Sequence, residues 1–274
     1  MTIFAINNYE LSIMPIKQTI HINTKYIADS NIVEFVNTIH TSFSSAGKVV
    51  YNKRNQLRII ETGSEAMDQV AVKRFKKLGF FRGLYYTFLG SSKAERCFNN
   101  ALELARRCIS TPEPLAMVEV KKNGVINTCY YICRCVQLPA IIDGLHWEDK
   151  FNPVMSADFA CMAARMHEAG VIHGDLNCDN VLYKKEADGH YSFTLIDINR
   201  MTIFPEVRPV SDKKAMADMC CFTRSLNVMR KVASDYVNAR GWNQSMTETM
   251  VRMKDRFNRR RALRKRILHP TRPY

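Results

Sequence analysis

The chain has 274 residues, of which 46% are hydrophobic, and it carries a formal net charge of +14. This length and apolar content support a large buried core and exclude a chain that is disordered throughout. The positive charge is concentrated near the end, because residues 252–274 contain ten lysines or arginines and one aspartate. Charge alone does not choose among nucleic acid, an anionic membrane and an acidic ligand as the partner of this segment.

The first half of the chain, roughly residues 21–137, is rich in strand signals. Three short apolar runs predict successive strands: Val49–Tyr51, Leu57–Glu61 and Gln69–Phe75. The pair Asn123 and Gly124 predicts a hairpin, because both central positions of such a turn need a positive φ. One helix is predicted among the strands, over Ser92–Arg107. Together these signals predict an antiparallel sheet.

The second half of the chain has the apolar spacing of helices. The first of them is predicted over Ser156–Ala169, with Ser156 as its cap and Gly170 at its end. Two short strands, Asn180–Tyr183 and Tyr191–Ile198, are predicted next, around an Asp-Gly turn. The remaining chain is predicted to form two or more helices.

The clearest chemical signal lies beside these two strands. Asp175 is followed five residues later by Asn180, and a second aspartate, Asp197, lies on the next predicted strand. Phosphoryl transfer needs a carboxylate to orient or deprotonate the acceptor hydroxyl, and it needs oxygen ligands that hold Mg²⁺ on the phosphates. Asp175 is therefore predicted to be the catalytic base. Asn180 and Asp197 are predicted to be metal ligands.

Upstream residues supply the parts that would bind ATP. Lys73 ends a Val-Ala-Val-Lys strand and is predicted to pair with phosphates, while Glu95 on the following helix would hold that lysine. The sequence has no Gly-x-Gly-x-x-Gly loop, so the turn with Arg54 and Asn55 is the candidate cover for the phosphates. A solvated hairpin turn explains these two residues equally well. The ordered set of lysine, glutamate, aspartate, asparagine and aspartate predicts a kinase.

These motifs resemble the protein-kinase-like superfamily and, within it, the lipopolysaccharide kinase (Kdo/WaaP) family. The resemblance extends from about Lys25 to Asp218. It rests on six short segments: Tyr51–Asn55, Val72–Phe75, Ser92–Arg96, Thr111–Pro114, His173–Asn177 and Ile196–Arg200. It implies one bilobal α+β domain with an antiparallel-sheet N-lobe over 1–132, a hinge at 133–138 and a mostly helical C-lobe over 139–251. A basic tail over 252–274 would follow.

The resemblance also implies a function. The chain would use ATP and Mg²⁺ to phosphorylate a hydroxyl of a lipopolysaccharide inner-core sugar, Kdo or a heptose, within a lipid-linked core oligosaccharide. Carried over by position, Lys73 and Glu95 would form the phosphate-binding ion pair, with Asp175 as base and Asn180 and Asp197 as Mg²⁺ ligands. The sequence leaves the acceptor sugar and its hydroxyl open.

The sequence departs from ordinary protein kinases in this region. Asn177 stands where many protein kinases have lysine, and Asp197 is followed by Ile-Asn rather than Phe-Gly. The segment between Asp197 and the next helix cap, Ser211, is too short for a long phosphorylated activation loop. His173 is expected to brace the catalytic loop through hydrogen bonds rather than to take part in catalysis.

Two other interpretations stay open. One is an atypical small protein kinase of the RIO-like kind, and the other is a pseudokinase or a nucleic-acid-binding scaffold. The complete set of kinase residues argues against the scaffold, so nucleic acid is not the expected partner. The nine cysteines lack zinc-binding spacing and fit a reducing cytoplasm. The basic segment Arg252–Arg272 is a candidate amphipathic helix that would contact the cytoplasmic face of the inner membrane.

Overall fold

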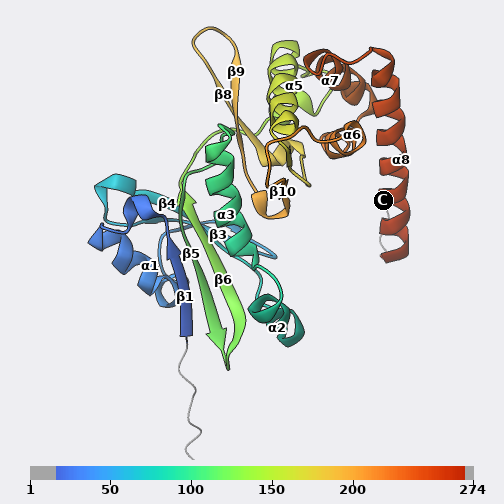
Figure 1. The fold of residues 1–274 in the computed structure, drawn as a ribbon. Helices are drawn as coiled ribbons and strands as arrows, with labels where there is room; N and C mark the ends of the chain where they lie inside the picture. Colours follow the sequence, from blue (N-terminus) through green and yellow to red (C-terminus); the bar gives the residue numbers. More distant parts are fainter. Residues whose placement is uncertain (1–16, 269–274) are drawn as a thin grey trace, which may run out of the picture. The chain divides into compact units, whose positions relative to one another are not determined.

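The fold is known from a computed structural model that describes residues 17–268 (Figure 1). Its contacts divide the chain into two compact units. The first unit comprises the residues up to Glu95 together with 115–132, and the second comprises 96–114 together with the residues from Cys133 onward. Each unit has its own buried core, so the two are described in turn.

The first unit is built on a six-stranded sheet (Figure 1). Its strands are β1 (Lys17–Ile22), β2 (Lys48–Asn52), β3 (Gln56–Glu61), β4 (Gln69–Arg74), β5 (Pro114–Lys122) and β6 (Val125–Arg134). Their order in the sheet is β1-β5-β6-β4-β3-β2, and β1–β5, β2–β3 and β3–β4 are antiparallel pairs. Asn123 and Gly124 join β5 to β6 with φ values of 54° and 77°. The hairpin predicted there is confirmed.

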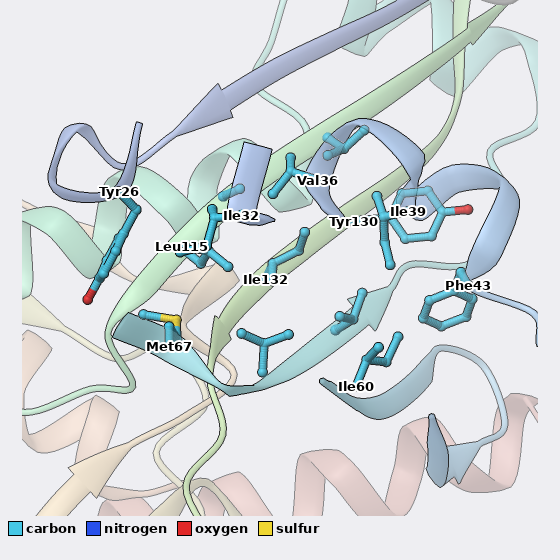
Figure 2. Packing of buried hydrophobic residues seen from close by; sticks show 14 residues of the cluster. Tyr26, Ile32, Val36, Ile39, Phe43, Ile60, Met67, Leu115, Tyr130 and Ile132 are labelled. Carbon is cyan, nitrogen blue, oxygen red and sulfur yellow. The ribbon is translucent and has the colours of Figure 1, made fainter. Parts of the chain in front are cut away.

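A helix that the sequence pattern did not predict covers one face of this sheet. Helix α1 (Ser30–Ser42) starts at Asp29, whose side chain accepts hydrogen bonds from the N–H groups of Asn31 and Ile32. Figure 2 shows its apolar face packed on buried sheet residues. The contacting side chains include Ile32, Val36 and Ile39 of α1 and Ile60, Leu115 and Ile132 of the strands. This layer is the hydrophobic core of the first unit.

Four shorter elements complete the first unit. They are the 3₁₀ turns η1 (Thr24–Tyr26) and η2 (Glu65–Met67), the helix α2 (Phe80–Phe88), and the start of helix α3 (Lys93–Arg106). Helix α3 confirms the helix predicted over 92–107, whereas α2 was not predicted. Because the division falls between Glu95 and Arg96, most of α3 belongs to the second unit.

The second unit is mainly helical. Its helices are α4 (Ile142–Leu145), α5 (Pro153–Glu168), α6 (Asp212–Met219), α7 (Leu226–Ala239) and α8 (Ser245–Leu268). Helix α7 packs against both α5 and α8 (Figure 1). In its core the rings of Phe159 and Phe222 stack with their centres 4.3 Å apart. This unit also has the short elements β7 (Val171–Ile172), η3 (Cys178–Asn180), β8 (Val181–Lys185), β9 (Tyr191–Leu195), η4 (Ile198–Arg200) and β10 (Thr202–Ile203).

Two predicted boundaries in this unit are wrong. Helix α5 starts three residues earlier than expected, because Asn152 caps it by accepting a hydrogen bond from the Met155 N–H. Ser156 is buried inside the helix, where its hydroxyl donates to Asp235. Asp197 does not lie on a strand, since β9 ends at Leu195 and Asp197 has a left-handed backbone with φ 57°.

Helix α8 carries most of the basic segment. Within it Lys254 is buried, and its ammonium group donates a 2.7 Å hydrogen bond to the backbone carbonyl of Cys220, just after α6. From Arg259 onward, the arginines and the apolar side chains of Leu263 and Ile267 are exposed. Residues 269–274, which include Arg272, lie outside the described residues. Among the helices of the described part, none has the length and apolar character to cross a membrane.

Candidate active site

Asp175 lies in a tight loop between β7 and η3. Its backbone carbonyl accepts hydrogen bonds from the backbone N–H of Asn177 and from the side-chain amide of Asn180, at 2.8 and 2.9 Å. Its carboxylate accepts from the side chain of Asn177 at 3.2 Å and is about one-third exposed. The loop therefore holds the predicted base at the surface of the second unit and ties it to Asn180.

A buried aspartate, Asp218 on α6, holds this loop from below. One of its carboxylate oxygens accepts the backbone N–H of His173 and the other that of Gly174, both at 2.8 Å. Burial by itself raises the pKa of Asp218, but hydrogen bonds from His167 and from these two N–H groups lower it below the usual value overall. Asp218 is therefore an ionised anchor for the two residues that precede Asp175.

His173 braces the same loop with its ring. Its Nε2 lies 3.2 Å from the carbonyl oxygen of Ile196, and its Nδ1 accepts the backbone N–H of Asp175 at 3.3 Å. An accepting Nδ1 requires a neutral ring with the proton on Nε2. Burial lowers the pKa of His173, which favours this neutral form. The ring therefore links the Asp175 loop to the chain just before Asp197, as expected for a structural histidine.

This arrangement predicts an acid-sensitive fold. The folded-state pKa of His173 lies below 6.5, its ordinary value. The neutral ring therefore makes its full contribution to stability above pH 6.5, and this contribution is lost as the pH falls from 6.5 toward the lowered pKa. We expect the free energy of unfolding, measured with urea from about pH 7.5 to about pH 5, to fall less steeply in His173→Gln than in the original chain. Equal slopes would contradict the assigned role of the ring.

Asn180 and Asp197 have the chemistry of magnesium ligands. The Asn180 side chain uses its nitrogen to bind the Asp175 carbonyl, so its carboxamide oxygen is the atom suited to a cation. The carboxylate of Asp197 accepts from the side chain of Asn199 at 2.6 Å. The backbone N–H of Ile196, one residue before Asp197, donates to the carbonyl of Asn180 at 3.0 Å. The two side chains thus come from neighbouring, hydrogen-bonded segments.

These two side chains would suit a metal that is shared with a nucleotide. Mg²⁺ prefers hard oxygen ligands, usually keeps several waters, and in kinases takes only a few protein ligands in addition to phosphate oxygens. No cluster of three or more His, Cys, Asp and Glu side chains that would hold a metal alone occurs between residues 17 and 268. The donor set of one carboxylate and one carboxamide therefore fits Mg²⁺ bound together with phosphates.

The turn at Asp197 is held by helix α3. Arg96 donates to the carbonyl of Asn199 at 3.0 Å, and Asn100 donates to that of Ile198 at 2.8 Å. A left-handed backbone is unfavourable for most residues but is accessible to aspartate. The side chains of α3 therefore stabilise the conformation in which Asp197 follows β9.

Arg200 is a site residue to which the sequence pattern assigned no role. Its guanidinium lies 3.0 Å from the second carboxylate oxygen of Asp175, while the first accepts from Asn177. Arg200 itself is exposed. It ends the Asp-Ile-Asn-Arg segment, which is the only sequence signal that could have drawn attention to it. The ion pair fixes the orientation of the predicted base.

The predicted phosphate-binding residues lie in the first unit. Lys73 is on β4 opposite Leu57 of β3, and its ammonium is 5.4 Å from the centre of the Phe75 ring. Glu95 lies in the first turn of α3, where its N–H donates to the hydroxyl of Ser92 at 3.1 Å. Both side chains are partly buried. The ion pair between them stays a prediction.

Arg54 and Asn55, the two candidate phosphate-covering residues, lie in the turn between β2 and β3 and have different surroundings. The side chain of Asn55 accepts the backbone N–H of Lys76 at 3.2 Å, which ties the turn to the chain after β4. Arg54 is exposed and lines a hollow of about 260 Å³ together with Lys76, Lys77 and Arg82. This hollow is rich in cations, as a site for anionic groups would be.

Comparison with known proteins gives consistent results. The family model of the lipopolysaccharide kinase (Kdo/WaaP) family matches residues 51–249. A 3-deoxy-D-manno-octulosonic acid kinase from Photobacterium damsela subsp. piscicida is 24% identical over 136 residues, which is 48% of this chain. The aligned part spans only 55% of that relative.

A solved structure agrees with the fold. The structure described as WaaP in complex with acyl carrier protein matches with a TM-score of 0.57, at 12% sequence identity, over 88% of this chain and 98% of the other. At this identity the likeness concerns the fold alone, and it confirms the predicted α+β, protein-kinase-like class. Since the family model covers well over half of the sequence, this chain belongs to the lipopolysaccharide kinase (Kdo/WaaP) family.

Proposed function

We propose that this protein is a kinase that transfers the γ-phosphoryl group of ATP to a hydroxyl of a lipopolysaccharide inner-core sugar, Kdo or a heptose. The observation that carries the proposal is the hydrogen-bonded loop of Asp175 and Asn180 beside Asp197, in a chain of this family. The same residue types serve as base and metal ligands in kinases. The kinase relative supports the Kdo branch of the proposal.

In this proposal Asp175 accepts the proton of the acceptor hydroxyl. The sugar oxygen forms a bond to the γ-phosphorus while the bond from that phosphorus to the bridging oxygen of ADP breaks. Asn180 and Asp197 hold Mg²⁺, which neutralises phosphate charge when bound. Lys73, kept in place by Glu95, and Arg54 bind phosphate oxygens, and Asn55 holds the turn that carries Arg54. Arg200 is a positioning residue, because it acts through the carboxylate of Asp175.

The test of this proposal is phosphate transfer with purified acceptors. We expect the protein with ATP and Mg²⁺ to add one phosphate to core oligosaccharide, detected by mass spectrometry, and to add none when Mg²⁺ is removed by a chelator. Core ending in Kdo and core carrying heptose would be compared to identify the acceptor. Phosphate found on added protein substrates, with neither glycan modified, would instead favour a protein kinase.

We also propose that the exposed part of α8 lies against an anionic membrane surface. Leu263 and Ile267 are exposed among several arginines, which is the pattern of an interfacial helix. Such a contact would bring the enzyme to a lipid-linked acceptor on the cytoplasmic face of the inner membrane. A variant with Leu263→Ser and Ile267→Ser leaves the charge unchanged and would separate apolar insertion from simple charge attraction.

A further inference from the structure

Helix α2 contacts the sheet of the first unit through the face that carries its small residues, Gly83 and Thr87. Gly83 is buried so close to β6 that a Cβ atom there would lie 2.4 Å from the carbonyl oxygen of Ile126. One turn later the hydroxyl of Thr87 accepts the N–H of Ile126 at 2.9 Å and donates to the carbonyl of Gly83 at 2.8 Å. Figure 1 shows α2 beside this end of β6. These contacts fix which side of the helix faces solvent.

The side that faces solvent is apolar. A soluble protein usually buries the apolar face of a surface helix, and α2 does the reverse. Phe81 is 85% exposed and Phe88 is 71% exposed. The other exposed apolar side chains in and next to α2 are Phe80, Leu84, Tyr85 and Leu89. A contiguous exposed patch of this kind marks a protein or membrane contact.

Cations surround the start of this helix. The segment that leads into α2 extends along β6, because the N–H groups of Phe75 and Leu78 donate to the carbonyls of Cys129 and Asn127. Lys76, Lys77 and Arg82 project around the hollow of about 260 Å³ described above. The described residues that line this hollow include five cationic side chains and no carboxylate. The exposed aromatic side chains of α2 therefore lie next to a hollow whose charged lining residues are all cationic.

We infer that α2 is an interfacial anchor whose aromatic face inserts into an anionic lipid bilayer, with Lys76, Lys77 and Arg82 at the lipid phosphates. The chemistry supports a bilayer over a protein groove. Exposed rings on one side of a helix beside basic residues are typical of helices that lie about 5–10 Å deep in the headgroup region. The charge of the patch is complementary to anionic lipids. Binding to lipid does not depend on the catalytic proposal.

The direct test is sedimentation of the full chain with phosphatidylcholine vesicles that contain or lack phosphatidylglycerol. We expect Phe81→Ser with Phe88→Ser to weaken binding to the anionic vesicles about tenfold or more, because two phenyl rings no longer leave water. The matched control is Ile27→Ser with Val207→Ser, which removes two exposed apolar side chains outside α2. This control should bind as the original chain does. Circular dichroism would establish that both variants are folded.

Two further measurements make the inference specific. Lys76→Ala with Lys77→Ala should lose most of the preference for phosphatidylglycerol. A tryptophan placed by Phe81→Trp should be quenched by brominated lipid, beyond the quenching of Trp147 and Trp242 in the original chain. Unchanged vesicle binding in the Phe81→Ser, Phe88→Ser variant would overturn the inference. The inference would also be overturned if this variant lost binding to an acidic protein, such as acyl carrier protein, and bound vesicles as the original chain does.

The kinase activity gives an independent readout. Phosphorylation of a soluble, deacylated core oligosaccharide should be the same in the original chain and in the Phe81→Ser, Phe88→Ser variant. With a vesicle-embedded acceptor the variant should be slower. If the original chain phosphorylates neither acceptor but binds vesicles through α2, the catalytic proposal fails and the membrane inference stands.

Discussion

Replacing Asp175 with asparagine is expected to lower the turnover number by about 10²- to 10⁴-fold, the usual contribution of a general base. The variant keeps the shape of the side chain and removes the negative charge that would accept the hydroxyl proton. The backbone carbonyl of Asp175, which binds Asn180, is untouched. Stability should therefore change little, and ATP binding should persist. Steady-state phosphate transfer and thermal unfolding would be measured on the same preparation.

Asp179→Asn is the matched control for this experiment. Asp179 is exposed, lies four residues further along the chain in η3, and loses the same charge in the same substitution. It should retain turnover close to that of the original chain. If Asp175→Asn and Asp179→Asn have equal and nearly full activity, Asp175 is not the base.

Replacing Asp218 with asparagine is expected to destabilise the fold by roughly 3 kcal/mol or more. The Asp218 carboxylate is almost fully buried and accepts two backbone N–H groups and the ring of His167. An asparagine nitrogen would oppose one of these donors and leave a buried polar group without a partner. Chemical denaturation at neutral pH would give the difference in the free energy of unfolding.

The pH dependence of this difference provides its control. Because the folded-state pKa of Asp218 lies below 3.8, its ordinary value, its ionised form contributes stability above that pH and loses it as the pH falls toward the lowered pKa. The gap between the original chain and Asp218→Asn should therefore narrow in acid. Asp212→Asn on the same helix should have little effect, since Asp212 is exposed and its ion pair with Arg240 is long, at 3.8 Å. A small effect of Asp218→Asn would contradict the anchoring role.

The sequence predicted those parts of the fold that have local signals. Asn123 and Gly124 predict their hairpin because few other residue types adopt positive φ. Helix α1 was missed although Ile32, Val36 and Ile39 have helical spacing, since β-branched residues favour strands. Helix α2 was missed for a different reason. Phe81, Tyr85 and Phe88 have helical spacing, but the run is short and rich in aromatic residues, which also favour strands.

The candidate site divides in the same way. The roles of Asp175, Asn180 and Asp197 could be predicted from their residue types and spacing, because the sequence states the chemistry of each side chain directly. The contacts that hold these residues in place could not be predicted from the sequence. Asp218 acts by accepting backbone N–H groups, which every residue except proline offers, so nothing in the sequence identifies its partners. The pairing of Arg200 with Asp175 arises from the turn that follows β9.

The buried ammonium of Lys254 divides α8 into two parts that respond differently to shortening of the chain. A deletion that removes Lys254 would leave the Cys220 carbonyl without its donor, immediately after the helix that carries Asp218. Such a deletion would disturb the loop that carries Asp175 as well as any contact with lipid. Asn258, further along α8, donates a second hydrogen bond to the rest of the unit, to the carbonyl of Arg224 at 3.1 Å. A deletion that begins at Arg259 would keep both of these hydrogen bonds, so it should disturb the loop of Asp175 less than a deletion that also removes Lys254.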